Sequence, residues 1–154
     1  MDNAVKLGQV LLARGASIAV AESLTAGLLQ AEIASVSGAS RYFAGGVTAY
    51  TLEQKVRILG VDREAAAAVN CVSEAVVRQM ACGVAARFGV SVAAATTGYA
   101  EPWGDVTEPF AHVAIYIDGV VTVGLVRAPG CSRRQVQQKT VSSVMEALVA
   151  ALMR

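Results

Sequence analysis

A serine and a lysine in this chain have the spacing and surroundings to act together on a carbonyl group. Ser23 follows a short apolar segment, and Lys55 lies roughly one helical turn beyond a second such segment. A lysine that is partly removed from water has a lowered pKa and can take a proton from a serine hydroxyl. If the two segments are neighbouring strands, the two side chains can meet. The alternative for Lys55 is a solvated surface position.

The stretch from Ala21 to Gly27 offers a possible anion site. The pattern predicts a helix that starts at Leu24, directly after Ser23. Free backbone amides at a helix start attract phosphate or carboxylate groups, and the hydroxyl groups of Ser23 and Thr25 could join them. The alternative is that one of these hydroxyl groups merely caps the helix.

Two further segments carry residues suited to ligand contact. Tyr50 ends an expected strand and could pack, stack on a ligand ring or donate a hydrogen bond. The stretch 96–105 contains glycine, proline and Trp103, the only tryptophan, and long loops of this kind are often functional. Trp103 could cover a flat ligand or plug the loop against the domain.

These residues must be positioned by an alternation of helices and strands. Apolar stripes at helical spacing and cap residues predict helices over 2–14, 24–36, 53–59, 64–69, 73–88 and 133–152. Runs rich in β-branched residues predict strands over 17–21, 46–51, 90–97, 110–117 and 120–128. Asp118-Gly119 between the last two is a strong signal for a tight hairpin.

This order predicts an α/β fold. The first three strands are joined through helices and should be parallel, whereas the hairpin requires one antiparallel strand. A mixed, mostly parallel five-stranded sheet with helices on both faces follows, which is a three-layer α/β/α sandwich. Ligands of such sheets bind outside the carboxyl ends of the parallel strands. The loops after Ala21, Tyr50 and Thr96 are all expected there.

Length and composition narrow the class of protein. The 154 residues are typical of one domain spanning 1–154, and 55% of them are hydrophobic. The net charge is +1 with acids and bases mixed, so we expect no nucleic-acid partner. No apolar run reaches the roughly 18 residues that cross a bilayer, so we expect no membrane partner. The first residues lack the layout of a signal peptide, which favours a cytoplasmic location.

Cysteine and histidine give no metal or disulfide pattern. The cysteines are Cys71, Cys82 and Cys131, an odd number at wide spacing, and we expect reduced thiols that pack as small hydrophobic groups. His112 is the only histidine and lies within an expected strand. We expect a structural histidine with satisfied hydrogen bonds, and no zinc site.

The same residues resemble a known family. Ala19 to Gly27 is similar to the AES-x-T-x-G signature of the CinA C-terminal domain family, the competence-damage-inducible proteins. Further matches follow in the same order, namely Gly38-Ala39-Ser40, Phe43, Gly45-Gly46-Val47 with Tyr50, Lys55 with Leu59-Gly60-Val61, Val72-Ser73-Glu74, Thr97-Gly98 and Pro129-Gly130. The resemblance covers roughly residues 17–152. As an ordered set the matches are specific.

The resemblance implies a fold, a reaction and a site. The fold is the three-layer sandwich already expected. The reaction is that of nicotinamide-nucleotide amidase, a hydrolase that converts nicotinamide mononucleotide and water to nicotinate mononucleotide and ammonia without metal or cofactor. Carried onto this chain, Ser23 is the nucleophile and Lys55 the base. The substrate-binding residues are Thr25, Gly27, Tyr50, Thr97 and Gly98. A small-molecule substrate and a homo-oligomer are expected.

The chain departs from the family pattern near this site. The glycine-rich TGIAGP-x-GG loop reads Thr97 to Gly104 here and carries Glu101 and Trp103. The KPVG segment is Glu108-Pro109-Phe110-Ala111. Two added carboxylates would repel a phosphate. Three functions therefore stay open: the amidase, a hydrolase of another small amide or nucleotide, and a non-catalytic module that binds a nucleotide or small molecule.

Overall fold

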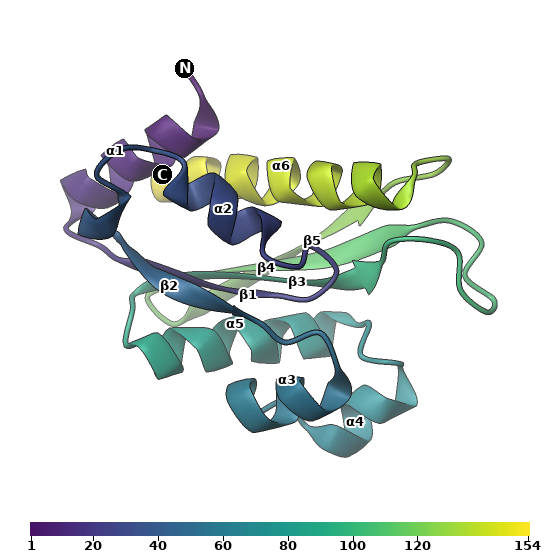
Figure 1. The fold of residues 1–154 in the computed structure, drawn as a ribbon. Helices are drawn as coiled ribbons and strands as arrows, with labels where there is room; N and C mark the ends of the chain where they lie inside the picture. Colours follow the sequence, from purple (N-terminus) through teal and green to yellow (C-terminus); the bar gives the residue numbers. More distant parts are fainter.

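The computed structural model describes residues 1–154 and arranges them in three layers (Figure 1). The middle layer is a sheet of five strands: β1 (Ile18–Glu22), β2 (Phe43–Thr48), β3 (Val92–Tyr99), β4 (Phe110–Ile117) and β5 (Val120–Arg127). One face is covered by α1 (Asn3–Arg14), α2 (Leu28–Ala34) and α6 (Arg133–Leu152), and the other by α3 (Leu52–Leu59), α4 (Arg63–Ala68) and α5 (Glu74–Phe88). A short 3-10 helix, η1 (Ala39–Arg41), precedes β2.

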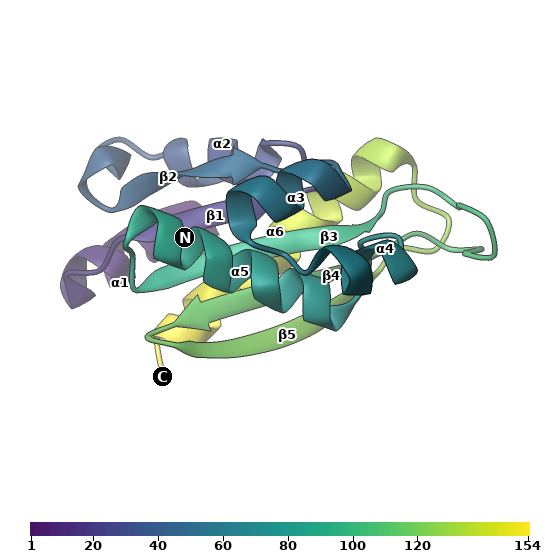
Figure 2. The same cartoon turned by 90° about the horizontal axis from the view of Figure 1, so that it is seen from below.

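The strand order is β2-β1-β3-β4-β5. β1 lies between β2 and β3 and is parallel to both, while β4 is antiparallel to β3 and to β5. Figure 2 shows the strands from the face that α5 covers. The predicted α/β fold with a mixed, mostly parallel sheet is thus confirmed, and the carboxyl ends of β1, β2 and β3 share one edge region.

The β4–β5 hairpin turns at Asp118 and Gly119, as predicted. Both residues have positive φ, 49° and 89°. Two successive positive φ values are characteristic of the type I′ turn, whose twist matches that of the two strands. The turn fixes the register of the antiparallel β4–β5 pair.

The structure corrects several predicted boundaries. The second helix begins at Leu28, not at Leu24, because Ala26 and Gly27 adopt positive φ values of 49° and 97° and keep 23–27 as a turn. β2 ends at Thr48, so Tyr50 lies beyond the strand. β3 continues to Tyr99, so Gly98 and Tyr99 belong to the strand and not to the loop after it.

Two apolar clusters flank the sheet. One joins α1, α2 and α6 to residues such as Ile18 and Val20 of β1, and the other joins α5 to Ala19 and Ala21 of the same strand. All five residues of β1 are buried, as is typical of a central parallel strand. The small side chains of β1 that face α5 let that helix lie close to the sheet.

Close packing also fixes α3, the helix that carries Lys55. A Cβ on Gly83 of α5 would clash with the carbonyl oxygen of Leu59, the last residue of α3. The two helices can therefore touch only because position 83 has no side chain. No helix of the structure combines the length and the apolar character that a bilayer crossing demands.

Candidate active site

Neighbouring parallel strands bring the Ser23 and Lys55 segments together. β1 pairs with β2 in a register that places Glu22 beside Thr48, the last residue of each strand. Ser23 follows β1 directly, and the segment after β2 leads within a few residues into α3. The condition set by the sequence, that the two strands be neighbours, is met.

Lys55 is buried and contacts Ser23. Its side chain is 1% exposed, and its Nζ lies 2.9 Å from Ser23 Oγ. The same nitrogen donates hydrogen bonds to the carbonyl oxygens of Ala49 (2.9 Å) and Tyr50 (3.2 Å). The alternative of a solvated surface lysine is therefore wrong.

Burial lowers the pKa of Lys55, because the charged ammonium is poorly solvated there. None of the ion pairs in the structure involves Lys55. The carbonyl oxygens of Ala49 and Tyr50 can only accept hydrogen bonds. A neutral amine would give both its hydrogens to these two oxygens and turn its lone pair toward the Ser23 hydroxyl. That is the geometry of a base poised to take a proton from serine.

Ser23 is held by β3. Its backbone N–H donates to Thr96 Oγ1 (3.3 Å), and the hydroxyl groups of Thr96 and Thr25 lie 2.9 Å apart. Thr25 and Thr96 are both buried, at 1% and 0% exposure. The predicted site residue Thr25 thus supports the turn that carries Ser23. Sequence reasoning assigned no role to Thr96; the signal for it was a polar residue inside an otherwise apolar strand.

Glu22 occupies the start of α2. Its buried carboxylate accepts hydrogen bonds from the backbone amides of Leu29 (2.8 Å) and Gln30 (3.0 Å). The expectation that a ligand anion binds the amides at the start of this helix is therefore wrong, because the chain's own carboxylate occupies them. So is the alternative that Ser23 or Thr25 caps the helix, since its N-cap is Gly27 without a side-chain bond. Sequence reasoning missed this role of Glu22.

Two backbone amides next to Ser23 remain free. The backbone N–H groups of Leu24 and Thr25 form no hydrogen bond in the structure. The next amides do: Ala26 donates to the carbonyl oxygen of Ser23, and Leu28 to that of Thr25. The two free amides follow the serine directly, so they are candidate donors to an oxyanion formed at Ser23.

Ser23 and Lys55 lie at the base of a pocket of about 420 Å³. Three of the other predicted site residues, Tyr50, Thr97 and Gly98, also line it. Thr25 and Gly27 do not: Gly27, with φ 97°, shapes the turn before α2. The remaining lining residues are Leu24, Thr51, Leu52, Asn70, Cys71, Val72, Tyr99, Ala100, Glu101, Trp103 and Arg133.

Thr97 and Gly98 line the pocket from the end of β3. The Thr97 hydroxyl donates to the carbonyl oxygen of Cys71 at 2.7 Å and so ties β3 to the segment before α5. A Cβ on Gly98 would clash with the carbonyl oxygen of Phe110 in β4. Glycine at this position is therefore required by the sheet itself.

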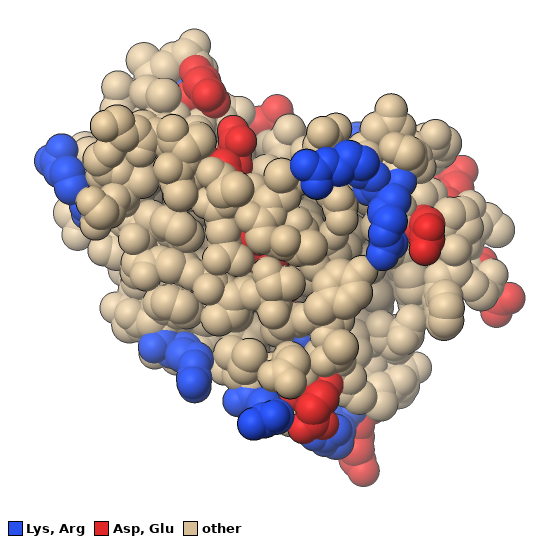
Figure 3. All heavy atoms as spheres, viewed as in Figure 1, with Lys and Arg blue, Asp and Glu red and all other residues tan.

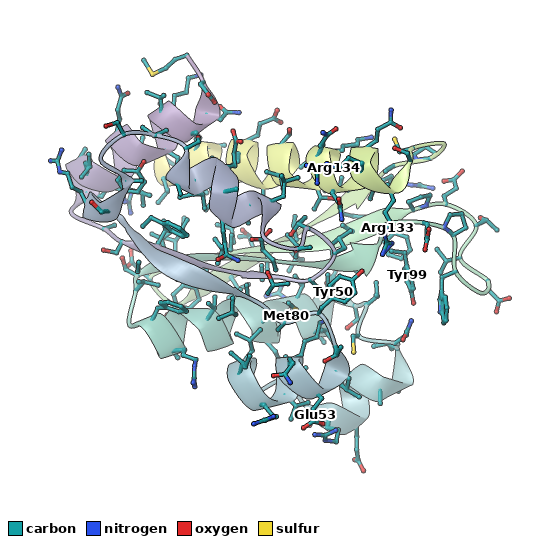
Figure 4. All side chains as sticks on the ribbon, viewed as in Figure 1. Tyr50, Glu53, Met80, Tyr99, Arg133 and Arg134 are labelled. Atoms are coloured by element: carbon teal, nitrogen blue, oxygen red, sulfur yellow. The ribbon has the colours of Figure 1, made fainter.

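The mouth of the pocket is built by exposed aromatic and charged side chains. Tyr50 is 49% exposed and its hydroxyl accepts a hydrogen bond from Arg133 at 2.8 Å. Figure 4 shows Tyr50, Tyr99 and Arg133 gathered at one end of the sheet. Trp103 is 63% exposed, so it does not plug the loop against the domain.

Two predictions for single residues are corrected. Cys71 is half-buried, has a φ of 62° and lines the pocket that holds Lys55, so it is not simply a packed hydrophobic group; all three cysteines are free thiols. The buried Nδ1 of His112 has no hydrogen-bond partner, so this histidine is not satisfied, and burial lowers its pKa. Its ring instead meets Phe110 edge-on, with centroids 5.6 Å apart.

Charged side chains are scattered. On the face shown in Figure 3, lysine and arginine lie among aspartate and glutamate near the margins, and no extended patch of one sign forms. No three histidine, cysteine, aspartate or glutamate side chains are grouped so as to hold a metal ion.

Comparison with known proteins identifies the family of this chain. The model of the CinA C-terminal domain matches residues 2–152. The chain belongs to the CinA C-terminal domain family. A CinA-like protein of Mycolicibacterium gilvum is 40% identical over 145 residues, which are 92% of this chain and 34% of that protein. A CinA-like protein of Mycobacterium tuberculosis is 40% identical over 141 residues, 89% of this chain and 33% of that protein.

The chain thus spans about a third of the length of these curated relatives. Solved CinA structures match it almost end to end. The competence damage-inducible protein A of Klebsiella pneumoniae has a TM-score of 0.94 at 28% identity, covering 99% of this chain and 96% of that one. A CinA superfamily protein of Escherichia coli has a TM-score of 0.87 at 26% identity, covering 99% and 88%.

Proposed function

We propose that this CinA-family domain is an amidohydrolase that uses Ser23 as nucleophile and Lys55 as base. The single observation that carries the proposal is the 2.9 Å separation of Ser23 Oγ and Lys55 Nζ, with Lys55 only 1% exposed. Nicotinamide mononucleotide is the proposed substrate, and nicotinate mononucleotide and ammonia are the products. Membership of this chain in the CinA C-terminal domain family supports the choice of a small-molecule substrate.

The reaction begins with attack by Ser23 Oγ on the amide carbonyl carbon while neutral Lys55 takes the hydroxyl proton. The carbonyl oxygen gains the negative charge, and the free amides of Leu24 and Thr25 are the candidate donors to it. Collapse of this intermediate breaks the carbon–nitrogen bond. The departing nitrogen takes the proton from Lys55 and leaves as ammonia.

The resulting ester on Ser23 is hydrolysed by reversal of these roles. A water molecule attacks the acyl carbon, Lys55 takes its proton and then returns it to Ser23 Oγ as the ester bond breaks. The product is a carboxylate, and the enzyme regains its starting state. Both half-reactions need the neutral amine, and burial favours that form by lowering the pKa of Lys55.

The pocket has the size that a mononucleotide requires and aromatic side chains that suit its ring. Its volume of about 420 Å³ falls within the roughly 300–1,000 Å³ range of small-molecule sites. Tyr50 and Trp103 offer aromatic faces at the mouth for a pyridine ring.

One observation favours a second candidate. At the pocket mouth, Glu101 stands where the family loop has a glycine, and Trp103 occupies the variable position of that loop. This suits a different small amide or a binding role without hydrolysis. Thermal unfolding with nicotinamide mononucleotide distinguishes these functions, because a ligand bound by the native state raises the melting temperature. Stabilisation without ammonia release supports a binding module, and no response supports another substrate.

The test of the proposal is ammonia release from nicotinamide mononucleotide. Wild-type protein should release ammonia, and Ser23→Ala should lose at least about 10³-fold in rate. Ser35→Ala is the matched control, because Ser35 is exposed and its hydroxyl bonds only the carbonyl of Glu32. Activity of Ser23→Ala equal to that of the control removes Ser23 as nucleophile.

A further inference from the structure

An ion pair closes one side of the pocket mouth. Arg133, the first residue of α6, places one guanidinium nitrogen 2.8 Å from the Tyr50 hydroxyl. Another of its nitrogens lies 3.6 Å from Glu101 Oε1, on the loop that follows β3. Tyr50, Glu101 and Arg133 all line the pocket that holds Ser23 and Lys55.

The charges of the lining residues are few. Among the sixteen, Lys55, Glu101 and Arg133 are the only lysine, arginine, aspartate or glutamate residues. Lys55 is buried and its amine is committed to Ser23 and two carbonyl oxygens. Arg133 is therefore the one cation that an entering anion can meet at the mouth, and Glu101 already neutralises it.

We infer that Glu101 is a specificity-determining residue that weakens the preference of this site for a phosphate group. The inference rests on the proposed function for its class of ligand, a pyridine nucleoside or its phosphate ester. A phosphate reaching Arg133 must displace the Glu101 carboxylate and then lie close to it. An uncharged nucleoside hydroxyl meets no such repulsion. The affinity for a nucleoside, relative to that for its phosphate ester, is thus higher than it would be without Glu101.

Exposure makes Glu101 suitable for a clean test. The side chains of Glu101 and Arg133 are 66% and 46% exposed, so their pairing contributes little to the stability of the fold. The repulsion between Glu101 and a dianionic phosphate acts at short range. Even with a high effective dielectric constant, it can lower the affinity roughly tenfold.

Glu108 supplies the matched control. Its carboxylate lies 3.6 Å from Arg127 in an exposed ion pair of the same length. Glu108 lines a different cavity together with His112 and Leu125, and it does not line the pocket that holds Ser23. The expectation that Glu108 lies near the proposed phosphate position is therefore wrong. Only Glu101 should affect ligands of the pocket.

The experiment is titration calorimetry with two nicotinate ligands, which have no amide for the protein to hydrolyse. Nicotinate mononucleotide and nicotinate riboside differ by the phosphate alone. Their affinity ratio is measured for wild type, Glu101→Gln and Glu108→Gln. We expect Glu101→Gln to raise the ratio in favour of the mononucleotide by roughly tenfold, with riboside affinity nearly constant and Glu108→Gln equal to wild type.

An unchanged ratio in Glu101→Gln, or an equal shift in Glu108→Gln, overturns the inference. So does a Glu101→Gln protein that binds neither ligand. Because the readout is binding, it is independent of ammonia release: a protein that binds with the expected ratios but never hydrolyses the amide disproves the proposed reaction and leaves the role of Glu101 standing.

Discussion

The chemistry of the site depends on one amine. Lysine is almost never fully buried unless it is paired, and Lys55 is 1% exposed without a carboxylate partner. The surrounding carbonyl oxygens of Ala49 and Tyr50 tolerate either protonation state, but burial favours the neutral one. An ordinary surface lysine would be protonated near neutral pH and could not accept a proton from Ser23.

The lowered pKa of Lys55 predicts a specific pH profile for hydrolysis. Below the native pKa of this amine, kcat/KM should rise about tenfold per pH unit, because only the neutral amine acts as base. Above that pKa the rate should level off, at a pH below the ordinary lysine value of 10.5. The measurement is initial ammonia release over a series of buffers. A rate that keeps rising up to that ordinary value contradicts the assignment of a lowered pKa.

The same pKa predicts a stability that depends on pH. Below the native pKa both the folded and the unfolded state hold the proton, and the folded state bears the full cost of a buried ammonium. Between the native pKa and 10.5 the unfolded state binds more protons, so the free energy of unfolding rises with pH in this window. Urea unfolding of wild type and Lys55→Met across pH 7 to 10 should show this rise in wild type only.

Lys139→Met is the control for that comparison, since Lys139 is exposed and its amine bonds only the carbonyl of Arg127. It should keep the pH dependence of wild type. A Lys55→Met variant that shows the same rise as wild type would assign the effect to another group.

At the scale of elements, the turn from β1 into α2 determines where Ser23 points. The turn at 23–27 passes through the positive φ values of Ala26 and Gly27, and Thr96 of β3 holds the Ser23 amide. Glu22 fixes the start of α2 by accepting two backbone N–H bonds. The N-terminal amides of α2 therefore bond to Glu22 of the same chain, and the turn at 23–27, not the helix, presents free amides near Ser23.

Glu22→Gln should destabilise this junction. A carboxylate that accepts two amide bonds would be replaced by an amide with one acceptor oxygen, and the loss should be about 2 kcal/mol. The measurement is the urea midpoint, with Glu146→Gln as control because Glu146 is exposed on α6 and forms no ion pair. The control should stay within about 0.5 kcal/mol of wild type. Equal midpoints for both variants contradict the role given to Glu22.

At the scale of the molecule, the parts that follow from periodicity were predictable. The alternation of helices and strands, together with the Asp118-Gly119 turn, was enough to predict the mixed sheet, because the rules for connecting strands leave few possible topologies. The meeting of Ser23 and Lys55 followed once β1 and β2 were taken as neighbours. Local turn geometry was not predictable: Glu22 as a cap, Thr96 as a support and the pairing of Arg133 with Glu101 all depend on contacts between distant segments.

The expected homo-oligomer remains a proposal about the whole molecule, and β5 is the surface that supports it. This edge strand has no charged residue between Val120 and Val126, and Val120 and Leu125 are 66% and 56% exposed. Bare, uncharged edges favour pairing with another strand. Light scattering should give a mass above the 15.9 kDa of one chain, and Thr122→Lys should lower it. A wild-type mass of one chain contradicts the proposal.

The most direct test of the account is the rate of ammonia release from nicotinamide mononucleotide by Lys55→Met. This variant keeps a side chain of similar length but removes the base. With a circular dichroism spectrum like that of wild type, its rate should be at least about 10³-fold lower. A folded Lys55→Met protein that hydrolyses the amide within tenfold of an active wild type would contradict the claim that this buried amine activates Ser23.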